Sequence, residues 1–169
     1  MGSDKILAAE GICKSYEIAG SKRAEVLKGL SIDIGKGELV ALMGPSGAGK
    51  STLLHILGSL DSPDKGKVVL NINGKEFDYS LVSKEELTLL RNKHIGFVFQ
   101  FHHLLPEFSA LENIMMPALI GGSSYKEAQT KASELALIVG INEQVHQKPS
   151  ELSGGEQQRT AIARALINE

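Results

Sequence analysis

The chain has 169 residues, of which 42% are hydrophobic and 22% are charged, a composition typical of one globular domain. Its formal net charge of −2 gives no reason to expect nucleic-acid binding, and its single cysteine, Cys13, excludes an intramolecular disulfide or a cysteine-based zinc cluster. No apolar run approaches the roughly 20 residues of a transmembrane helix, and residues 1–11 lack the pattern of a signal peptide, so we expect a cytoplasmic protein.

The first third of the chain has the pattern of short strands. Residues 5–18 and 25–38 alternate apolar and polar side chains, which predicts an antiparallel sheet with one face in water. Residues 38–43, ELVALM, are almost continuously apolar and predict a strand that is buried on both faces. Residues 51–60 predict a helix, and Asn73-Gly74 between two apolar runs predicts a hairpin.

The second half is mainly helical by its start and stop signals. Ser-x-x-Glu capping boxes begin at Ser83, Ser109 and Ser124, and each predicts a helix start. Residues 94–100, HIGFVFQ, form a compact apolar segment that predicts a further strand. The third of these helices has an alanine-rich apolar face and is followed by Gly140, which is placed to end it.

The stretch GPSGAGKST at residues 44–52 fits the phosphate-loop pattern G-x-x-x-x-G-K-[ST]. Glycines let consecutive backbone N–H groups point at phosphate oxygens, and the following helix adds the positive end of its dipole. Lys50 has the reach to contact the β- and γ-phosphates, and the Ser51 hydroxyl suits Mg²⁺. The residues expected to bind the nucleotide here are Gly44, Pro45, Ser46, Gly47, Ala48, Gly49, Lys50, Ser51 and Thr52.

A second candidate anion site lies at the start of the last predicted helix. Ser153 and Glu156 form a fourth capping box, and Gly154 and Gly155 remove side chains from the first turn. One triphosphate rarely needs two such sites from one chain. The pair therefore suggests a nucleotide clamped between two copies of the chain, head to tail.

In order along the chain, GPSGAGKST, the glutamine that ends GFVFQ, and LSGGEQQRTAIARAL resemble the ATP-binding cassette family of transporter ATPases. The resemblance implies an α/β fold of the phosphate-loop ATPase type, with an N-terminal antiparallel β subdomain and an α-helical subdomain. It implies that Tyr16 stacks on adenine and that Gln100 contacts Mg²⁺ and the attacking water. It also implies that residues 153–156 contact the γ-phosphate held by the opposite copy. ATP and Mg²⁺ are the expected ligands.

Within that family, residues 99–120 and 53–66 resemble the ATPase subunits of bacterial lipoprotein-releasing transporters, with macrolide-exporter and cell-division ATPases as alternatives. Such subunits lie on the cytoplasmic face of the inner membrane and bind integral membrane subunits. Phe101, Leu104, Leu105 and Phe108 are candidate anchors for that partner, or else fill the core of the helical block. His102 and His103 are poor candidates for a metal site, because adjacent strand residues point to opposite sides.

The resemblance divides the chain into a nucleotide-binding core at residues 1–100, a helical subdomain at 101–152, and the signature loop with its helix at 153–169. In the family, an apolar strand ending in Asp and then Glu follows that helix, and a histidine follows further on. No Asp-Glu of this kind occurs in the 169 residues, so we expect a fragment that hydrolyses ATP feebly and binds nucleotide weakly.

Other classes are less consistent with the sequence. A soluble family member acting on DNA or ribosomes usually carries long coiled-coil insertions or tandem cassettes, and neither is present. A phosphate-loop kinase or GTPase leaves LSGGEQQR unexplained. A nucleotide-binding fragment without hydrolytic activity remains a further alternative for this chain.

Overall fold

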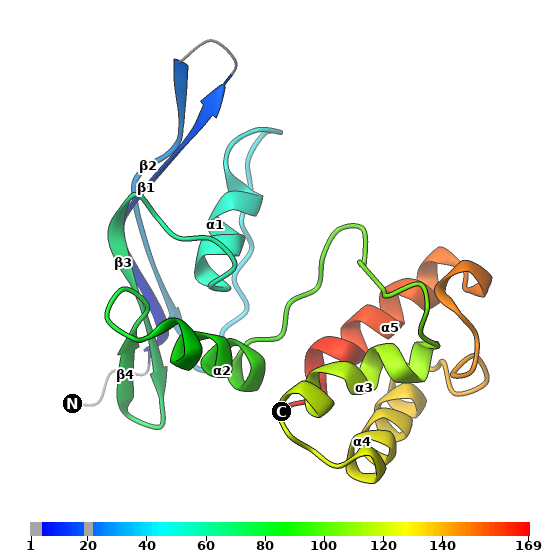
Figure 1. Cartoon of the computed structure of the whole chain (residues 1–169). Coiled ribbons are helices and arrows are strands. Elements are labelled where there is room, and N and C mark those ends of the chain that lie inside the picture. The colour runs from blue at the N-terminus through cyan, green and yellow to red at the C-terminus, as the bar shows by residue number, and fades with distance from the viewer. Residues whose placement is uncertain (1–4, 19–21) are drawn as a thin grey trace. The chain divides into compact units, whose positions relative to one another are not determined.

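The computed structural model describes residues 5–18 and 22–169. The chain folds into two compact units, one ending at Leu87 and the other beginning at Thr88. The first unit is built on an antiparallel sheet and the second on helices (Figure 1). We describe each unit by itself.

The sheet of the first unit has the strand order β2-β1-β3-β4. β1 (Lys5–Ile18) pairs antiparallel with both β2 (Lys22–Gly35) and β3 (Lys65–Ile72), and β3 pairs with β4 (Lys75–Asp78). Asn73 and Gly74 join β3 to β4 with φ angles of 53° and 83°, the left-handed pair that a two-residue hairpin turn requires. The predicted antiparallel strands and the hairpin are therefore confirmed.

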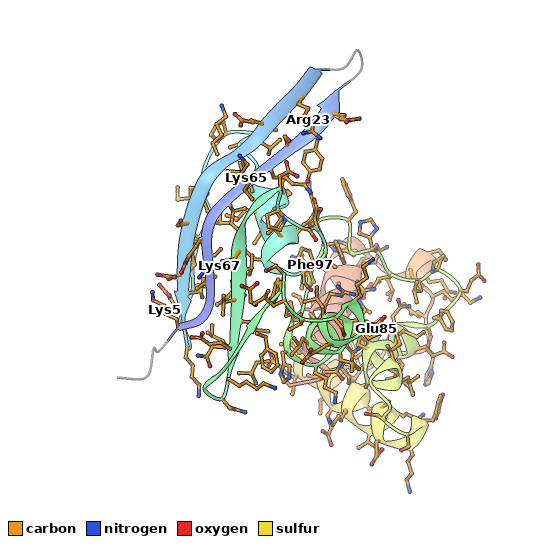
Figure 2. The ribbon with its side chains drawn as sticks, turned by 60° about the vertical axis from the view of Figure 1, so that its left-hand side comes forward. Lys5, Arg23, Lys65, Lys67, Glu85 and Phe97 are labelled. Carbon is orange, nitrogen blue, oxygen red and sulfur yellow. The ribbon has the colours of Figure 1, made fainter. Side chains whose placement is uncertain are left out.

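One face of the sheet is polar and the other is apolar. On the polar face, Lys5 contacts Asp33 at 2.6 Å and Lys67 contacts Glu10 at 3.1 Å, and Figure 2 shows both lysines on their strands. On the apolar face, α1 (Lys50–Leu57) packs against the strands, and its C-cap is Gly58. The buried residues of this core are Ala9, Ile12, Leu27, Leu53, Ile56, Leu57 and Val68. The chain therefore forms the antiparallel sheet with one face in water that the alternation of apolar and polar residues predicts.

Two predicted strands are wrong. Residues 38–43 have no regular structure, and Leu39 and Met43 are 98% and 92% exposed. Residues 95–99 are also irregular, and residue 94 is the last residue of α2 (Lys84–His94). An apolar run indicates a tendency to be buried, but a strand also needs a neighbour for its N–H and C=O groups. In the described residues, neither segment has a place in the sheet.

The second unit contains α3 (Ala110–Ile120), α4 (Tyr125–Ile138) and α5 (Gly154–Leu166), with a short 3₁₀ helix at Pro149–Glu151. Ser109, Ser124 and Ser153 cap the three long helices with complete capping boxes, and Ser83 accepts from the Glu86 N–H at the start of α2. The predicted helix starts are therefore confirmed. In the part of the chain that the structure describes, no helix has the length and apolar composition needed to cross a bilayer.

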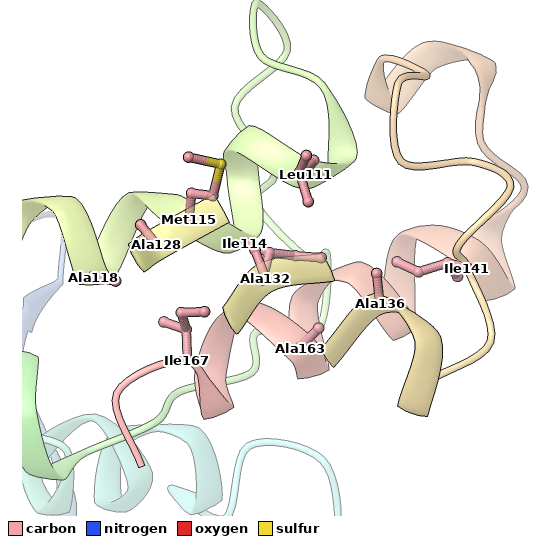
Figure 3. Packing of buried hydrophobic residues seen from close by; sticks show 10 residues of the cluster. All are labelled: Leu111, Ile114, Met115, Ala118, Ala128, Ala132, Ala136, Ile141, Ala163 and Ile167. Carbon is pink, nitrogen blue, oxygen red and sulfur yellow. The ribbon is translucent and has the colours of Figure 1, made fainter. Parts of the chain in front are cut away.

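The core of the second unit lies where α3, α4 and α5 meet (Figure 3). Ala128, Ala132 and Ala136 present the small-residue face of α4 and are almost completely buried, as the sequence predicts. Gly140 follows the end of α4 with a φ angle of 70°, which ends the helix in the left-handed region. The other buried members of the cluster are Leu111, Ile114, Met115, Ala118, Ile141, Ala163 and Ile167.

Candidate nucleotide-binding site

The loop at residues 44–49 runs into the first turn of α1 and is open to solvent. The Ala48 N–H donates to Pro45 O at 3.3 Å, which closes a tight turn, and residues 44–48 are all exposed. Gly49 is the N-cap of α1, with a φ angle of 85°. A Cβ there would lie 2.9 Å from side-chain carbons of both Leu27 and Val26, so only glycine fits this junction between loop, helix and sheet.

Lys50 folds back over the loop that precedes it. Its Nζ donates to Gly44 O at 2.8 Å and to Pro45 O at 2.7 Å, so the ammonium group is held against the first two residues of the loop. Ser51 follows in the first turn and is exposed. The loop thus combines a cation, the N-terminal end of a helix and a free hydroxyl. This donor set fits a polyphosphate together with a hard divalent cation.

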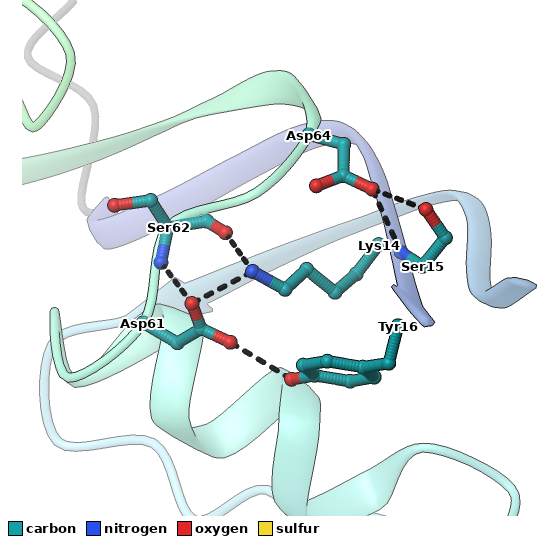
Figure 4. A network of polar contacts seen from close by, with 6 residues as sticks. All are labelled: Lys14, Ser15, Tyr16, Asp61, Ser62 and Asp64. Carbon is teal, nitrogen blue, oxygen red and sulfur yellow. Dashed lines mark hydrogen bonds and ion pairs between the residues drawn. The ribbon is translucent and has the colours of Figure 1, made fainter. Parts of the chain in front are cut away.

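Tyr16 lies on β1, close to the first turn of α1. Its hydroxyl donates to Asp61 Oδ2 at 2.8 Å (Figure 4), and the Thr52 side chain lies close to it. The residue is 41% exposed. Partial burial, followed by the hydrogen bond to Asp61, raises the pKa of Tyr16, so the phenol stays protonated at neutral pH. The structure therefore brings Tyr16 and Thr52 of the phosphate loop together.

The signature loop opens α5 in the second unit. Ser153 is the N-cap, and the Glu156 carboxylate accepts from its N–H and hydroxyl, both at 2.7 Å. These hydrogen bonds from Ser153 lower the pKa of Glu156, which keeps the carboxylate charged. Gly154 and Gly155 are exposed at the helix mouth. A Cβ on Gly154 would meet no atom within 4 Å, so the fold of this chain does not itself require glycine at that position.

Gln100 is exposed in a turn of the second unit, just before the segment 101–108. In that segment Phe101, Leu105 and Phe108 are exposed and Leu104 is half-buried, so the first three do not fill the core. Gln100 and the phosphate loop belong to different units, and the role of Gln100 stays a prediction.

Two residues that the sequence did not single out hold this segment in place. Arg164 of α5 donates to the carbonyl oxygens of His102 and His103, both of which have positive φ angles. Asn113 of α3 is fully buried and bonds to Leu105 and Phe108. A polar residue on an otherwise apolar helix face is the only sequence signal for Asn113. Nothing local indicates the role of Arg164.

Asp61 is a third residue whose role the sequence did not reveal. It lies in DSPDKG, which indicates only the end of a helix. In the structure it contacts both Lys14 and Tyr16 of β1, far away in the sequence.

A family model for ABC transporters matches residues 27–169, and the chain belongs to this family of transporter ATPases. Its fold is that of solved ATP-binding cassettes. The cassette MJ0796, solved as a dimer in a post-hydrolysis state bound to ADP and Pi, superposes with a TM-score of 0.86 at 38% identity, covering 96% of this chain and 69% of that one. The predicted fold class is thereby confirmed.

Among individual relatives, the chain is similar to the lipoprotein-releasing system ATP-binding protein LolD of Bacteroides fragilis. The two are 56% identical over 160 residues, which is 95% of this chain and 70% of the relative. The protein of the same name from Legionella pneumophila is 48% identical over 167 residues, 99% of this chain and 71% of that relative.

Proposed function

We propose that this chain is the ATP-binding part of an ABC transporter ATPase, and that residues 44–52 bind the triphosphate of ATP with Mg²⁺. The observation that carries the proposal is the open loop into α1 with Lys50 held against it. Tyr16 beside the first turn of the same helix supplies a ring surface for the adenine. Membership of the ABC transporter family favours ATP over other phosphate-containing ligands.

Each residue has a defined task in this site. The phosphate loop holds the phosphates by backbone N–H groups, and Lys50 exchanges its two carbonyl partners for β- and γ-phosphate oxygens. Ser51 would hold Mg²⁺, which supplies charge neutralisation during phosphoryl transfer. Contact of Gln100 with Mg²⁺ and the attacking water is what the family resemblance implies, and it stays a prediction. Catalysis of this reaction depends mainly on such positioning and electrostatic stabilisation.

A second copy of the chain completes the site, head to tail, with Ser153, Gly154, Gly155 and Glu156 facing the γ-phosphate of the opposite copy. The exposed N-terminus of α5 supports this arrangement, because a Cβ at Gly154 would meet no atom of its own chain and glycine is not needed there for steric reasons. A close approach from outside explains the missing side chain. The solved cassettes similar to this chain include dimers.

The exposed segment 101–108 is the surface that we assign to the integral membrane subunits. Phe101 is 77% exposed, and Leu105 and Phe108 flank it as further apolar anchors. By similarity to the LolD proteins, the transporter would release lipoproteins, and the ATPase would lie on the cytoplasmic face of the bacterial inner membrane.

Substitution of Lys50 tests the nucleotide site directly. Removing a charge-assisted contact to phosphate typically costs about 1.5–3 kcal/mol, so Lys50→Ala should weaken ATP binding by roughly tenfold or more. Titration calorimetry of the chain with Mg-ATP measures the affinity. Lys36→Ala, which removes one exposed lysine from the same unit, is the matched control and should bind ATP as the parent does. ATP affinity of Lys50→Ala equal to that of the control would contradict the proposal.

A further inference from the structure

Asp61 occupies the centre of a polar network between the sheet and the end of α1 (Figure 4). One carboxylate oxygen, Oδ2, accepts from the Tyr16 hydroxyl at 2.8 Å. The other, Oδ1, accepts from Lys14 Nζ at 2.7 Å and from the Ser62 N–H at 2.7 Å. Both oxygens are thus used, and each fixes a different residue of β1.

Lys14 adds a second restraint on the tyrosine ring. Its Nζ also donates to Ser62 O, and it lies 5.3 Å from the centroid of the Tyr16 ring. The Lys14 and Asp61 side chains are only 11% and 31% exposed, so solvent screens this ion pair less than a surface pair. A cation near one ring face leaves the rest of the exposed ring for another partner.

An exposed tyrosine on a strand would otherwise sample several side-chain rotamers. Fixing such a side chain on ligand binding carries a cost in conformational entropy. The hydrogen bond of the Tyr16 hydroxyl to Asp61, together with Lys14 near the ring, holds the side chain in one orientation beforehand. A ligand that stacks on the ring therefore meets a surface that is already ordered.

We propose that Asp61 is a positioning residue that orders the Tyr16 ring for the base of the nucleotide, while it takes no part in binding the phosphates. This inference rests on the proposed function, in which Tyr16 stacks on adenine. Asp61 acts through Tyr16 and Lys14, the two side chains of β1 that its carboxylate contacts. Its contribution is thus confined to ligands that carry a base.

The charge states of the network suit this role over the neutral pH range. Partial burial works against the charged form of Asp61, but hydrogen bonds from Lys14, Tyr16 and the Ser62 backbone outweigh it and lower the pKa of Asp61. Burial also opposes the charge on Lys14, but the hydrogen bond and charge of Asp61 outweigh it and raise the pKa of Lys14. Both groups therefore stay charged, and the phenol stays protonated.

The test compares a ligand with a base and a ligand without one. Calorimetry measures the affinity of the chain for Mg-ATP and for Mg-tripolyphosphate. Asp61→Ala should weaken ATP binding by roughly three- to tenfold, the effect of one net hydrogen bond, and leave tripolyphosphate binding unchanged. Tyr16→Phe keeps the ring but loses the anchor, so it should weaken ATP binding to a similar degree. The double variant Asp61→Ala/Tyr16→Phe should weaken ATP binding little more than either single variant, because both substitutions remove the same hydrogen bond.

Asp64→Ala is the matched control. Asp64 comes from the same turn and is also a hydrogen-bonded carboxylate, but it accepts from the Ser15 N–H and hydroxyl and not from Tyr16. Asp64→Ala should therefore leave the affinity for ATP unchanged. Equal losses of ATP and tripolyphosphate affinity in Asp61→Ala would overturn the inference, because they would indicate a general distortion of the loop.

The other outcomes separate this inference from the proposed function. If Lys50→Ala weakens ATP binding while Asp61→Ala and Tyr16→Phe do not, the nucleotide site stands and the positioning role fails. If the unsubstituted chain binds neither ligand, both proposals fail together. A loss in Asp64→Ala as large as that in Asp61→Ala would also contradict the role assigned to Asp61.

Discussion

Asn113 should be among the most sensitive polar positions of the second unit. It is completely buried in α3, and its amide faces the loop before the helix. Oδ1 accepts from the Leu105 N–H at 2.7 Å, and Nδ2 donates to the carbonyl oxygens of Leu105, Phe108 and Ser109 at 3.1, 3.1 and 2.9 Å. One side chain therefore holds the base of the loop that carries the exposed apolar residues.

The cost of Asn113→Ala follows from which groups lose their partner. Ser109 O keeps the Asn113 N–H, and Leu105 O keeps the Phe108 N–H. The Leu105 N–H and Phe108 O, in contrast, lose their hydrogen bonds to the Asn113 side-chain amide. Two such losses at about 1 kcal/mol each, with a small cavity in addition, predict a destabilisation of about 2–3 kcal/mol. Asn113→Asp should cost more, because a carboxylate of the same shape has no donor for the three carbonyl oxygens.

Urea unfolding followed by far-ultraviolet circular dichroism measures the free energy of unfolding of the helical unit. Asn142→Ala changes an exposed asparagine of the same unit and should shift that free energy by less than about 0.5 kcal/mol. The reasoning would be refuted if Asn113→Ala were no more destabilised than this control. It would also be refuted if Asn113→Asp were as stable as the parent. Faster hydrogen exchange at the Leu105 amide is the expected local signature.

Two further predictions concern α5 and the helix caps. Gly154→Ala should stabilise the chain by roughly 0.5–1 kcal/mol in thermal unfolding, because alanine is the better helix former and its Cβ meets no atom within 4 Å. The same change should reduce ATP-dependent dimerisation in sedimentation experiments, and undiminished dimerisation would argue against a contact at this glycine. Hydrogen bonds from the capping serines lower the pKa of Glu112, Glu127 and Glu156, so their stabilisation is complete above about pH 4.5 and is lost as the pH falls through the lower folded values. The measurement is the urea midpoint of unfolding as a function of pH. The triple variant with glutamine in place of these three glutamates should lose part of the acid dependence. Glu143→Gln, which changes an exposed glutamate, is the control and should keep it.

Local signals in the sequence predicted the parts of the fold that local chemistry determines. Ser109 and Ser124 cap helices because their hydroxyls and the following glutamates satisfy N–H groups within one turn. Asn73 and Gly74 form the hairpin turn because both tolerate positive φ angles. Such features need no information from elsewhere in the chain.

Features that depend on distant partners were missed. The apolar residues 38–43 and 94–100 predicted strands, but strand formation depends on a neighbour that composition does not specify. The phosphate loop and the signature loop could be proposed as sites because their glycines and capping residues are contiguous in the sequence. Asp61, Asn113 and Arg164 were not, because each acts on a segment that only the tertiary fold brings near.

The open segment 38–43 has a consequence for how the protein behaves at high concentration. A run of leucine, valine, alanine and methionine without proline, and with a single acidic residue at its start, is free to associate with the same run in a neighbouring molecule. Its backbone is not engaged in the sheet, so such association would gain intermolecular hydrogen bonds as well as apolar contact. We therefore expect Leu39→Lys, which places a charge in this exposed stretch, to reduce precipitation of the purified chain as measured by light scattering.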